Sequence, residues 1–397
     1  MSEKKQNILI VHNYYQIPGG EDTVVANEKK LLEENGHEVF LYTRHNLELK
    51  EFHKLQKLLL PVSTVFNFQT YREVKKLIKE KNIDVLHVHN TLNLVSPSVY
   101  YAGFSSKIPV VQTVHNFRLL CPGATFFRDG HVCEDCLKKG LACAVKYKCY
   151  RGSMIQTLAC VISAVIHRNI GTYKKIHFIC LTEFNKEKLL HLRQIQENHI
   201  FIKPNFVLDT GKNIICEERK NQMIYVGRLE EIKGVDVLLE AWKILGNDAP
   251  ELIMCGTGPM EEWCRNYVRE HHLTKVKIAG FVKNEIVREM IGQSRALVLP
   301  TQVYEGFPMT ILEAMSVGTP VIGSKLGNVG TLIKDSVNGI RFEAKSAEEL
   351  AEVVKTFKAD YNCVSEYYQK NYSREANYRK LKEIYDTAIS ETIEECL

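Results

Sequence analysis

The chain has 397 residues, of which 45% are hydrophobic and 25% charged, a balance typical of a folded protein with two or three domains. The net charge of +5 is too small to indicate nucleic acid as the partner, and it is compatible with an anionic ligand or an acidic membrane surface. No apolar run reaches the roughly 18 residues of a spanning helix, and the charged first residues do not resemble a signal peptide. We therefore expect a cytoplasmic protein.

Short apolar runs alternate with longer helical patterns along the chain. The runs are rich in Val, Ile and Leu without polar alternation, which is typical of strands buried on both faces of a parallel sheet. Because strands and helices alternate, the sequence predicts an α/β fold with parallel sheets. The predicted strands are 7–12, 38–43, 84–89, 109–115 and 177–181 in the first half, and 223–226, 251–255, 275–278, 296–299 and 320–322 in the second; the clearest helices are 24–35, 71–81, 235–245 and 261–271.

The series of strands starts again after a polar stretch, residues 209–221. We place a domain boundary there, which gives a first domain of residues 1–208 and a second domain of residues 209–372. The tail, residues 373–397, is a long helical pattern with no strand after it. We expect this tail to cross back and pack on the first domain.

Glycine pairs follow the first strand of the chain and the second strand of the second domain. Gly19 and Gly20 open a helix, where a bare backbone and a helix N-terminus both favour an anion. Gly256 and Gly258 would let a nucleotide lie against the chain after strand 251–255. Each pair alone is a weak signal, because neighbouring glycines are also common in ordinary turns.

Two cations, Arg228 and Lys233, follow the first strand of the second domain. Ligands of parallel α/β sheets bind at the carboxyl ends of the strands, so this pair is suited to a diphosphate. The guanidinium can grip phosphate oxygens bidentately, and the lysine acts as a point charge. A solvated loop with ordinary surface charges is the alternative.

The most informative run is residues 305–315, which follows the predicted strand 296–299. Glu305 lies in a glycine-rich turn, and Glu313 lies inside the helix that begins near Pro308. The two carboxylates can therefore touch different parts of one extended ligand, with the helix N-terminus between them directed at phosphate. Structural glutamates in the first turns of a helix are the alternative.

Polar groups converge where two strands of the first domain end. His115 ends the strand 109–115, while His87, His89 and Asn90 end the preceding strand. A histidine in this place can hydrogen-bond a ligand hydroxyl or stabilise developing charge. A lone histidine is more often structural, but the convergence favours a functional role for His115.

Together these motifs resemble the family 4 glycosyltransferases, also called glycosyl transferases group 1, of GT-B fold. The run from Glu305 to Glu313 is similar to the family's Glu-x7-Glu motif, and the other motifs match in order and spacing across nearly the whole chain. The resemblance implies two facing Rossmann-like domains and a retaining transfer of sugar from a nucleotide diphosphate, either UDP or GDP. Backbone amides near Gly20 would add to the binding of the diphosphate.

The resemblance also implies a role for each side chain. Arg228 and Lys233 would hold the donor diphosphate and stabilise its charge as it leaves. Glu313 would take the ribose hydroxyls, Glu305 would orient the donor sugar, and His115 would line its reacting face. The sequence has no Asp-x-Asp motif for a divalent ion, so we expect no catalytic metal and assign the electrostatic stabilisation to the two cations.

Five of the 12 cysteines lie between residues 121 and 149. Cys133 and Cys136 have zinc-knuckle spacing, and Cys121 with either Cys143 or Cys149 could complete a tetrahedral thiolate site. We predict a closed structural zinc site with Cys121, Cys133, Cys136 and Cys149 as ligands. Free or redox-active thiols are the alternative in a reducing compartment.

The cysteines belong to a segment, residues 121–152, that resembles an insertion in some bacterial family members that build capsular or other surface polysaccharides. No catalytic role is implied for it. The resemblance does favour a saccharide acceptor, in particular a lipid-linked one, at the inner face of the membrane.

Residues 49–59 form an amphipathic pattern at helical spacing. Phe52, Leu55, Leu58 and Leu59 share one face, and lysines 50, 54 and 57 lie mainly elsewhere. A basic amphipathic helix could rest on an anionic membrane, whereas a packed surface helix with solvated lysines is the alternative.

Two other functions are compatible with the sequence. A sugar-nucleotide epimerase of GT-B fold would consume a nucleotide sugar without an acceptor. A zinc-bearing assembly factor would have no activity, although it would then be free to lose Glu313 or Lys233. The run from Glu305 to Glu313 together with Arg228 and Lys233 fits sugar transfer better than either alternative.

Overall fold

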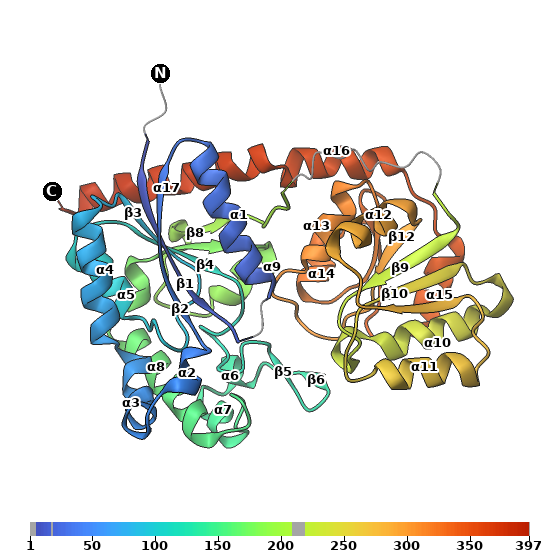
Figure 1. Cartoon of the computed structure of the whole chain (residues 1–397), viewed down its shortest axis with the longest axis horizontal. Coiled ribbons are helices and arrows are strands. Elements are labelled where there is room, and N and C mark those ends of the chain that lie inside the picture. The colour runs from blue at the N-terminus through green and yellow to red at the C-terminus, as the bar shows by residue number, and fades with distance from the viewer. Residues whose placement is uncertain (1–4, 17–18, 209–218, 397) are drawn as a thin grey trace. The chain divides into compact units, whose positions relative to one another are not determined.

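The computed structural model describes residues 5–16, 19–208 and 219–396. The chain divides into two compact units (Figure 1). The first unit comprises residues 1–126, 133–205 and 377–397, and the second comprises residues 127–132 and 206–376.

The first unit is built on a parallel sheet, in which the described residues supply six strands. Residues 8–11 of its first strand have no exposed surface, because helices cover both faces of the sheet. The strands are β1 (Asn7–Tyr14), β2 (Glu38–His45), β3 (Val85–Val88), β4 (Val110–Val114), β7 (His177–Cys180) and β8 (Ile200–Ile202). Their order across the sheet is β2-β1-β3-β4-β7-β8.

Helices from both ends of the chain pack on this sheet. Val25 and Leu32 of α1 (Gly20–Glu34) and Leu381 and Ile384 of α17 (Arg374–Cys396) share one hydrophobic core with β1, β3, β4 and β7. Figure 1 shows the red α17 running along the sheet beside the blue α1. The other helices of this unit are α2 (Glu48–Glu51), α3 (Lys54–Val65), α4 (Phe68–Glu80), α5 (Ser98–Ser105), α6 (Asp135–Lys138), α7 (Ala142–Lys146), α8 (Met154–Asn169) and α9 (Glu183–Leu189).

The second unit repeats the design with a second parallel sheet, in the order β11-β10-β9-β12-β13-β14. These strands are β9 (Gln222–Val226), β10 (Glu251–Cys255), β11 (Val276–Gly280), β12 (Ala296–Leu299), β13 (Val321–Ser324) and β14 (Gly339–Phe342). The helices are α10 (Val235–Leu245), α11 (Glu261–Glu270), α12 (Asn284–Gln293), α13 (Met309–Ser316), α14 (Gly327–Leu332), α15 (Ala347–Thr356) and α16 (Tyr361–Tyr372), and a small hairpin joins β5 (Phe127–Arg128) to β6 (His131–Val132).

Each sheet has a point where the order of the strands reverses. In the first sheet the chain passes from β1 to β2 and then returns to β3 on the other side of β1; in the second, β9 is followed on one side by β10 and on the other by β12. Ligands of such sheets bind outside the carboxyl ends of the strands at this reversal. The fold therefore marks two places: the ends of β1 and β3, and the ends of β9 and β12.

The α/β fold predicted from the sequence is confirmed: both sheets are parallel and every predicted strand is present. The prediction of one helix over residues 49–59 is wrong. The backbone of Phe52 is extended between α2 and α3, with φ −62° and ψ 130°. The His53 N–H donates to Gln56 Oε1 at 2.9 Å and closes a capping box that starts a new helix at Lys54. The local cap outweighs the continuous apolar spacing.

No helix within the described ranges is long and apolar enough to cross a membrane.

Candidate functional site

Lys233 and Glu305 meet at the point of strand reversal in the second unit. Lys233 ends a short turn after β9, and Glu305 follows β12. The Lys233 ammonium donates to both carboxylate oxygens of Glu305, at 2.7 and 2.9 Å, and the Thr301 hydroxyl donates to Glu305 Oε1 at 2.9 Å. Both charged side chains are partly exposed. The structure thus brings together two of the predicted site residues in a place that a ligand can reach.

Gly234 makes that meeting possible. Its φ is +72°, and a Cβ atom there would lie 1.9 Å from the Pro300 carbonyl oxygen. Only glycine combines the left-handed backbone with this close approach. The loop carrying Lys233 can therefore lie directly against the end of β12, within reach of Glu305.

The glycines after β10 have a similar packing role. Gly256 has φ +141°, and a Cβ atom there would lie 1.9 Å from the Gly227 carbonyl oxygen. At Gly258 the corresponding distance to the Leu229 carbonyl oxygen is 2.3 Å. Only glycine at these positions lets the loops after β9 and β10 pack against each other. The sequence alone did not indicate this packing role. Their contact with a nucleotide stays a prediction.

Arg228 is close to this group in sequence but is directed into solvent. Its side chain is 71% exposed, and its guanidinium lies 3.3 Å from the carboxylate of Glu230. Exposed ion pairs of this kind contribute little to stability. The guanidinium is therefore available to an anionic ligand, and within the described residues Arg228 and Lys233 have different carboxylate partners.

Glu313 lies in the second turn of α13, and its side chain is partly buried. Burial raises the pKa of this carboxyl, and the nearby Arg288 guanidinium opposes the rise. In the part of the chain that the structure describes, no side-chain or backbone donor bonds to the Glu313 carboxylate. A desolvated acceptor of this kind gains free energy from ligand hydroxyls.

In the first unit Gly19 caps α1 and Gly20 is its first residue, so the pair opens a helix as predicted, while Pro18 of the same motif lies outside the described residues. The Gly19 N–H donates to Asp22 Oδ2 at 2.9 Å, and Asp22 Oδ1 lies 2.7 Å from His12 Nε2. The amide of Gly19 is therefore used within the protein. A contact of Gly20 with phosphate stays a prediction.

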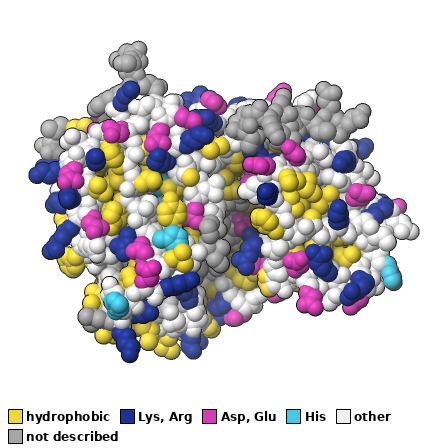
Figure 2. Space-filling model, viewed as in Figure 1, with side chains coloured by type: hydrophobic (Ala, Val, Ile, Leu, Met, Phe, Trp, Pro, Cys, Tyr) yellow, Lys and Arg dark blue, Asp and Glu magenta, His cyan; other side chains and the backbone are white. Residues whose placement is uncertain are grey.

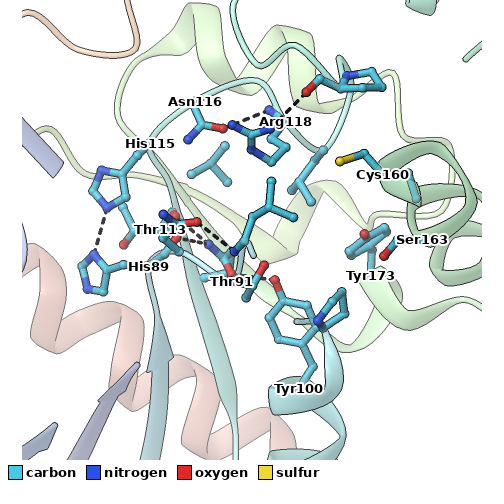
Figure 3. A pocket seen from close by; sticks show the side chains of 18 of the residues that line it. His89, Thr91, Tyr100, Thr113, His115, Asn116, Arg118, Cys160, Ser163 and Tyr173 are labelled. Atoms are coloured by element: carbon cyan, nitrogen blue, oxygen red, sulfur yellow. Dashed lines mark hydrogen bonds between the residues drawn. The ribbon is translucent and has the colours of Figure 1, made fainter. Parts of the chain in front are cut away.

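His115 follows β4 and lines a pocket within the first unit (Figure 3). His115 Nε2 lies 2.8 Å from Nδ1 of His89, which follows β3. Burial lowers the pKa of both rings well below the usual value, and nearby cationic or protonatable groups act in the same direction. Figure 3 shows the two rings on one side of the pocket, with Arg118 above and Cys160 and Tyr173 opposite.

Sequence reasoning missed the charged pair behind these histidines. Glu28 of α1 and Lys203 after β8 have no exposed surface, and Lys203 Nζ lies 2.5 Å from Glu28 Oε1. The only signal was the position of Glu28 on the buried face of α1, four residues after Val24 and four before Leu32. Lys203 is 175 residues away in sequence, so no local pattern joins the two.

The cysteine cluster lies in the first unit beside α8. The interaction between the Cys121 and Cys136 thiols lowers the pKa of Cys121 and raises that of Cys136. Cys143 and Cys149 are close enough to act electrostatically on Cys136. Among the described residues, no three cysteine sulfur atoms lie within 4.8 Å of one another. Zinc binding stays a prediction.

Comparisons with known families agree with this geometry. The family model "Glycosyl transferases group 1" matches residues 212–376, and "Glycosyltransferase Family 4" matches residues 18–131. Together they cover well over half of the chain, including β3 of the first sheet and the strand reversal of the second sheet. The chain is a GT-B glycosyltransferase that depends on a nucleotide sugar, and it belongs to glycosyltransferase family 4.

Relatives and solved structures cover nearly the full length. An uncharacterized glycosyltransferase of Methanocaldococcus jannaschii is 23% identical over 90% of this chain and 89% of its own length. An uncharacterized protein of the cps region of Klebsiella pneumoniae is 20% identical over 87% of this chain and 88% of its own.

Two crystal structures show the same fold. A glycosyltransferase of Rickettsia africae has a TM-score of 0.67 at 18% identity, covering 97% of this chain and 99% of its own. HepE of Anabaena, solved with UDP and glucose, has a TM-score of 0.60 at 17% identity, covering 96% of this chain and all of its own.

Proposed function

We propose that the protein is a retaining, metal-independent glycosyltransferase that moves a sugar from UDP or GDP to a lipid-linked saccharide in surface polysaccharide biosynthesis. The observation that best supports a donor-binding site is the ion pair between Lys233 and Glu305 at the strand reversal of the second unit. It places a cation and an acceptor of hydroxyl hydrogen bonds side by side. This is the pattern expected where a diphosphate joins a sugar.

The ion pair suggests how the donor is held. The diphosphate lies against Lys233 and the exposed Arg228, while Glu305 accepts hydrogen bonds from hydroxyls of the sugar. Glu313 accepts from the ribose hydroxyls, which supply the donors that its carboxylate lacks in the described residues. The N-terminus of α13 lies between the two glutamates in sequence and favours negative charge.

Bond breaking creates charge on the diphosphate. As the bond between the sugar's anomeric carbon and the phosphate oxygen breaks, negative charge grows on the leaving group next to the two cations. The acceptor hydroxyl forms its bond to the same face of the sugar, and its proton passes to the departing phosphate. These cations supply the stabilisation that a divalent ion would otherwise give.

The first unit is suited to a lipid-linked acceptor. A pocket of about 320 Å³ lies in this unit, within the usual range for ligand sites. Its lining combines apolar residues with the polar Thr64, Asn93 and Gln156 and the basic Lys57 and Arg151. Residues of α3 and α8 contribute to the lining, and the two helices also expose Leu58 and Ile155, at 74% and 72%. Figure 2 shows hydrophobic and basic side chains mixed at the end of this unit where α3, α7 and α8 lie.

This mixture favours contact with an anionic membrane. Isolated exposed apolar residues are ordinary, but a continuous apolar surface with basic residues is typical of interfacial binding. The exposed apolar residues of the two helices, besides those two, are Leu59, Val62, Met154, Leu158, Ile162, Val165 and Ile166. The surface is thus supplied by both helices and not by the predicted segment 49–59 alone.

The experiment is a transfer assay with labelled UDP- and GDP-sugars and a lipid extract that contains phosphate-linked saccharides. We expect one nucleotide to support transfer of label into lipid, undiminished by a chelator, and NMR of the product to show the donor's anomeric configuration. Inverted configuration or loss of transfer with chelator would contradict the proposed mechanism. Conversion of the donor into an epimer with no acceptor would replace the proposal by an epimerase.

A further inference from the structure

A row of buried groups extends from α1 to the pocket residue His115. Glu28 Oε2 lies 3.4 Å from His89 Nε2, and His89 Nδ1 lies 2.8 Å from His115 Nε2. Glu28 Oε2 and His89 Nε2 are both buried and neither has a hydrogen-bond partner among the described residues, although the 3.4 Å between them is within reach of a hydrogen bond. The two atoms face each other in a region without exposed side-chain surface.

The charge on Glu28 determines which atoms donate and which accept protons along this row. Lys203 Nζ lies 2.5 Å from Glu28 Oε1, and both side chains are fully buried, so the carboxylate and the ammonium form a buried ion pair. An ionised carboxylate can only accept hydrogen bonds. The proton between Glu28 and His89 therefore belongs to Nε2 of His89.

Because both rings are neutral, each has one donor and one acceptor nitrogen, so the assignment at His89 fixes the assignment at His115. Burial lowers the pKa of His89 and of His115 well below the usual value, so each ring holds one proton at neutral pH. With that proton on Nε2, Nδ1 of His89 is an acceptor. His115 must then donate from its own Nε2, which leaves Nδ1 of His115 without a proton.

The other histidines nearby, His87 and His12, have partners of their own and do not compete for the protons of His89 and His115. His87 Nδ1 lies 2.7 Å from the Tyr385 hydroxyl and its Nε2 lies 2.8 Å from the Thr113 hydroxyl, so both nitrogens are used. His12 Nε2 is paired with the carboxylate of Asp22.

A metal ion is a weaker explanation of the same cluster. Ligand atoms of Glu28, His87 and His89 all lie within 4.8 Å of one another. However, the Lys203 ammonium already neutralises the Glu28 carboxylate and would repel a second cation. A hydrogen bond across the 3.4 Å between Glu28 Oε2 and His89 Nε2 would satisfy both atoms without that conflict.

We propose that Glu28 and His89 are positioning residues, which hold His115 as the tautomer whose Nδ1 accepts a hydrogen bond from a substrate hydroxyl. His115 is then a recognition group that requires a hydroxyl donor and does not itself donate to developing negative charge. This inference rests on the proposed function, because it needs a sugar hydroxyl in the pocket of the first unit.

Glu28→Gln offers a sharp perturbation because Lys203 restricts how the new amide can turn. The amide oxygen accepts from Lys203, which leaves the NH₂ group facing His89 Nε2. That nitrogen must now accept, so the proton of His89 moves to Nδ1 and His115 receives its hydrogen bond at Nε2. We therefore expect the proton of His115 to move to Nδ1, which reverses its role toward the substrate.

The test uses ¹⁵N-histidine-labelled full-length protein and long-range ¹H–¹⁵N NMR, with the His115 signals identified by their loss in His115→Gln. The wild type should show His115 protonated on Nε2, and Glu28→Gln should show it protonated on Nδ1 with kcat/KM reduced about 10- to 100-fold. Tyr385→Phe is the matched control, because it removes a buried hydrogen bond from His87 but leaves the row intact. It should keep the wild-type tautomer of His115.

The outcomes separate this inference from the proposed function. A wild-type His115 protonated on Nδ1 overturns the inference, and this spectrum decides the matter even if Glu28→Gln does not fold. Reversed tautomers with unchanged kcat/KM overturn the positioning role. If the wild type has the expected tautomer but turns over no nucleotide sugar with any acceptor extract, the proposed function fails while the tautomer assignment stands.

Discussion

Substituting Gly234 by alanine should damage both stability and donor binding. A left-handed backbone costs an L-residue about 1–2 kcal/mol. The added Cβ would lie 1.9 Å from the Pro300 carbonyl oxygen, whereas such contacts are essentially never under 3.0 Å. The backbone must therefore shift by roughly 1 Å, which costs a further ~1–3 kcal/mol. We expect Gly234→Ala to lower the free energy of unfolding by about 2–5 kcal/mol in total.

The same shift moves Lys233 away from Glu305. A displacement of about 1 Å at a catalytic group can reduce the rate roughly 100-fold. Equilibrium urea unfolding and turnover of nucleotide sugar measure the two effects. Gly280→Ala is the matched control, because Gly280 has φ +68° in the same unit but no atom within 4 Å of the added Cβ. Equal losses of stability in the two variants, or full turnover by Gly234→Ala, would refute the reasoning.

Three further predictions concern single groups. Lys233→Met should weaken binding of the nucleotide diphosphate by roughly 10- to 100-fold, since it removes a charge-assisted contact of about 1.5–3 kcal/mol. Calorimetry with UDP and GDP measures the affinity, and an unchanged affinity would contradict the prediction. The protein should lose stability as pH falls below about 6.5, because the buried histidines 87, 89 and 115 have lowered pKa values and take up protons more readily in the unfolded state. The free energy of unfolding measured between pH 5 and 7 tests this, and a stability that rises on acidification would oppose it. Protein purified without chelator under reducing conditions should contain about one zinc per chain, by elemental analysis, if the cysteine cluster closes as a tetrahedral site; absence of zinc would leave the Cys121–Cys136 thiol pair as the alternative.

The buried strands were predictable because each is a short run of apolar residues with no polar alternation. The edge strands β8 and β14 were missed, since each is only three or four residues long and partly exposed. The break between α2 and α3 was missed because a cap at His53 acts over three residues, whereas amphipathic spacing averages over many.

The donor-side motifs were recognisable because their residues lie close together in sequence or follow strands. The pairing of Lys233 with Glu305 spans 72 residues, so it needed the sheet order to bring β9 next to β12. The ion pair of Glu28 and Lys203 was hidden for the same reason, over a longer separation. Local patterns thus identify chemical groups, while the topology decides which groups meet.

Thermal stability with nucleotides tests the central claim most directly, namely that the strand reversal of the second unit binds the donor. Ligand at about 100 times its dissociation constant adds nearly 3 kcal/mol of stability, enough to raise the melting temperature measurably. We predict that either UDP or GDP, with the matching sugar nucleotide, stabilises the wild type and that Lys233→Met and Glu313→Ala lose this effect. An equal shift in the wild type and both variants would contradict the account.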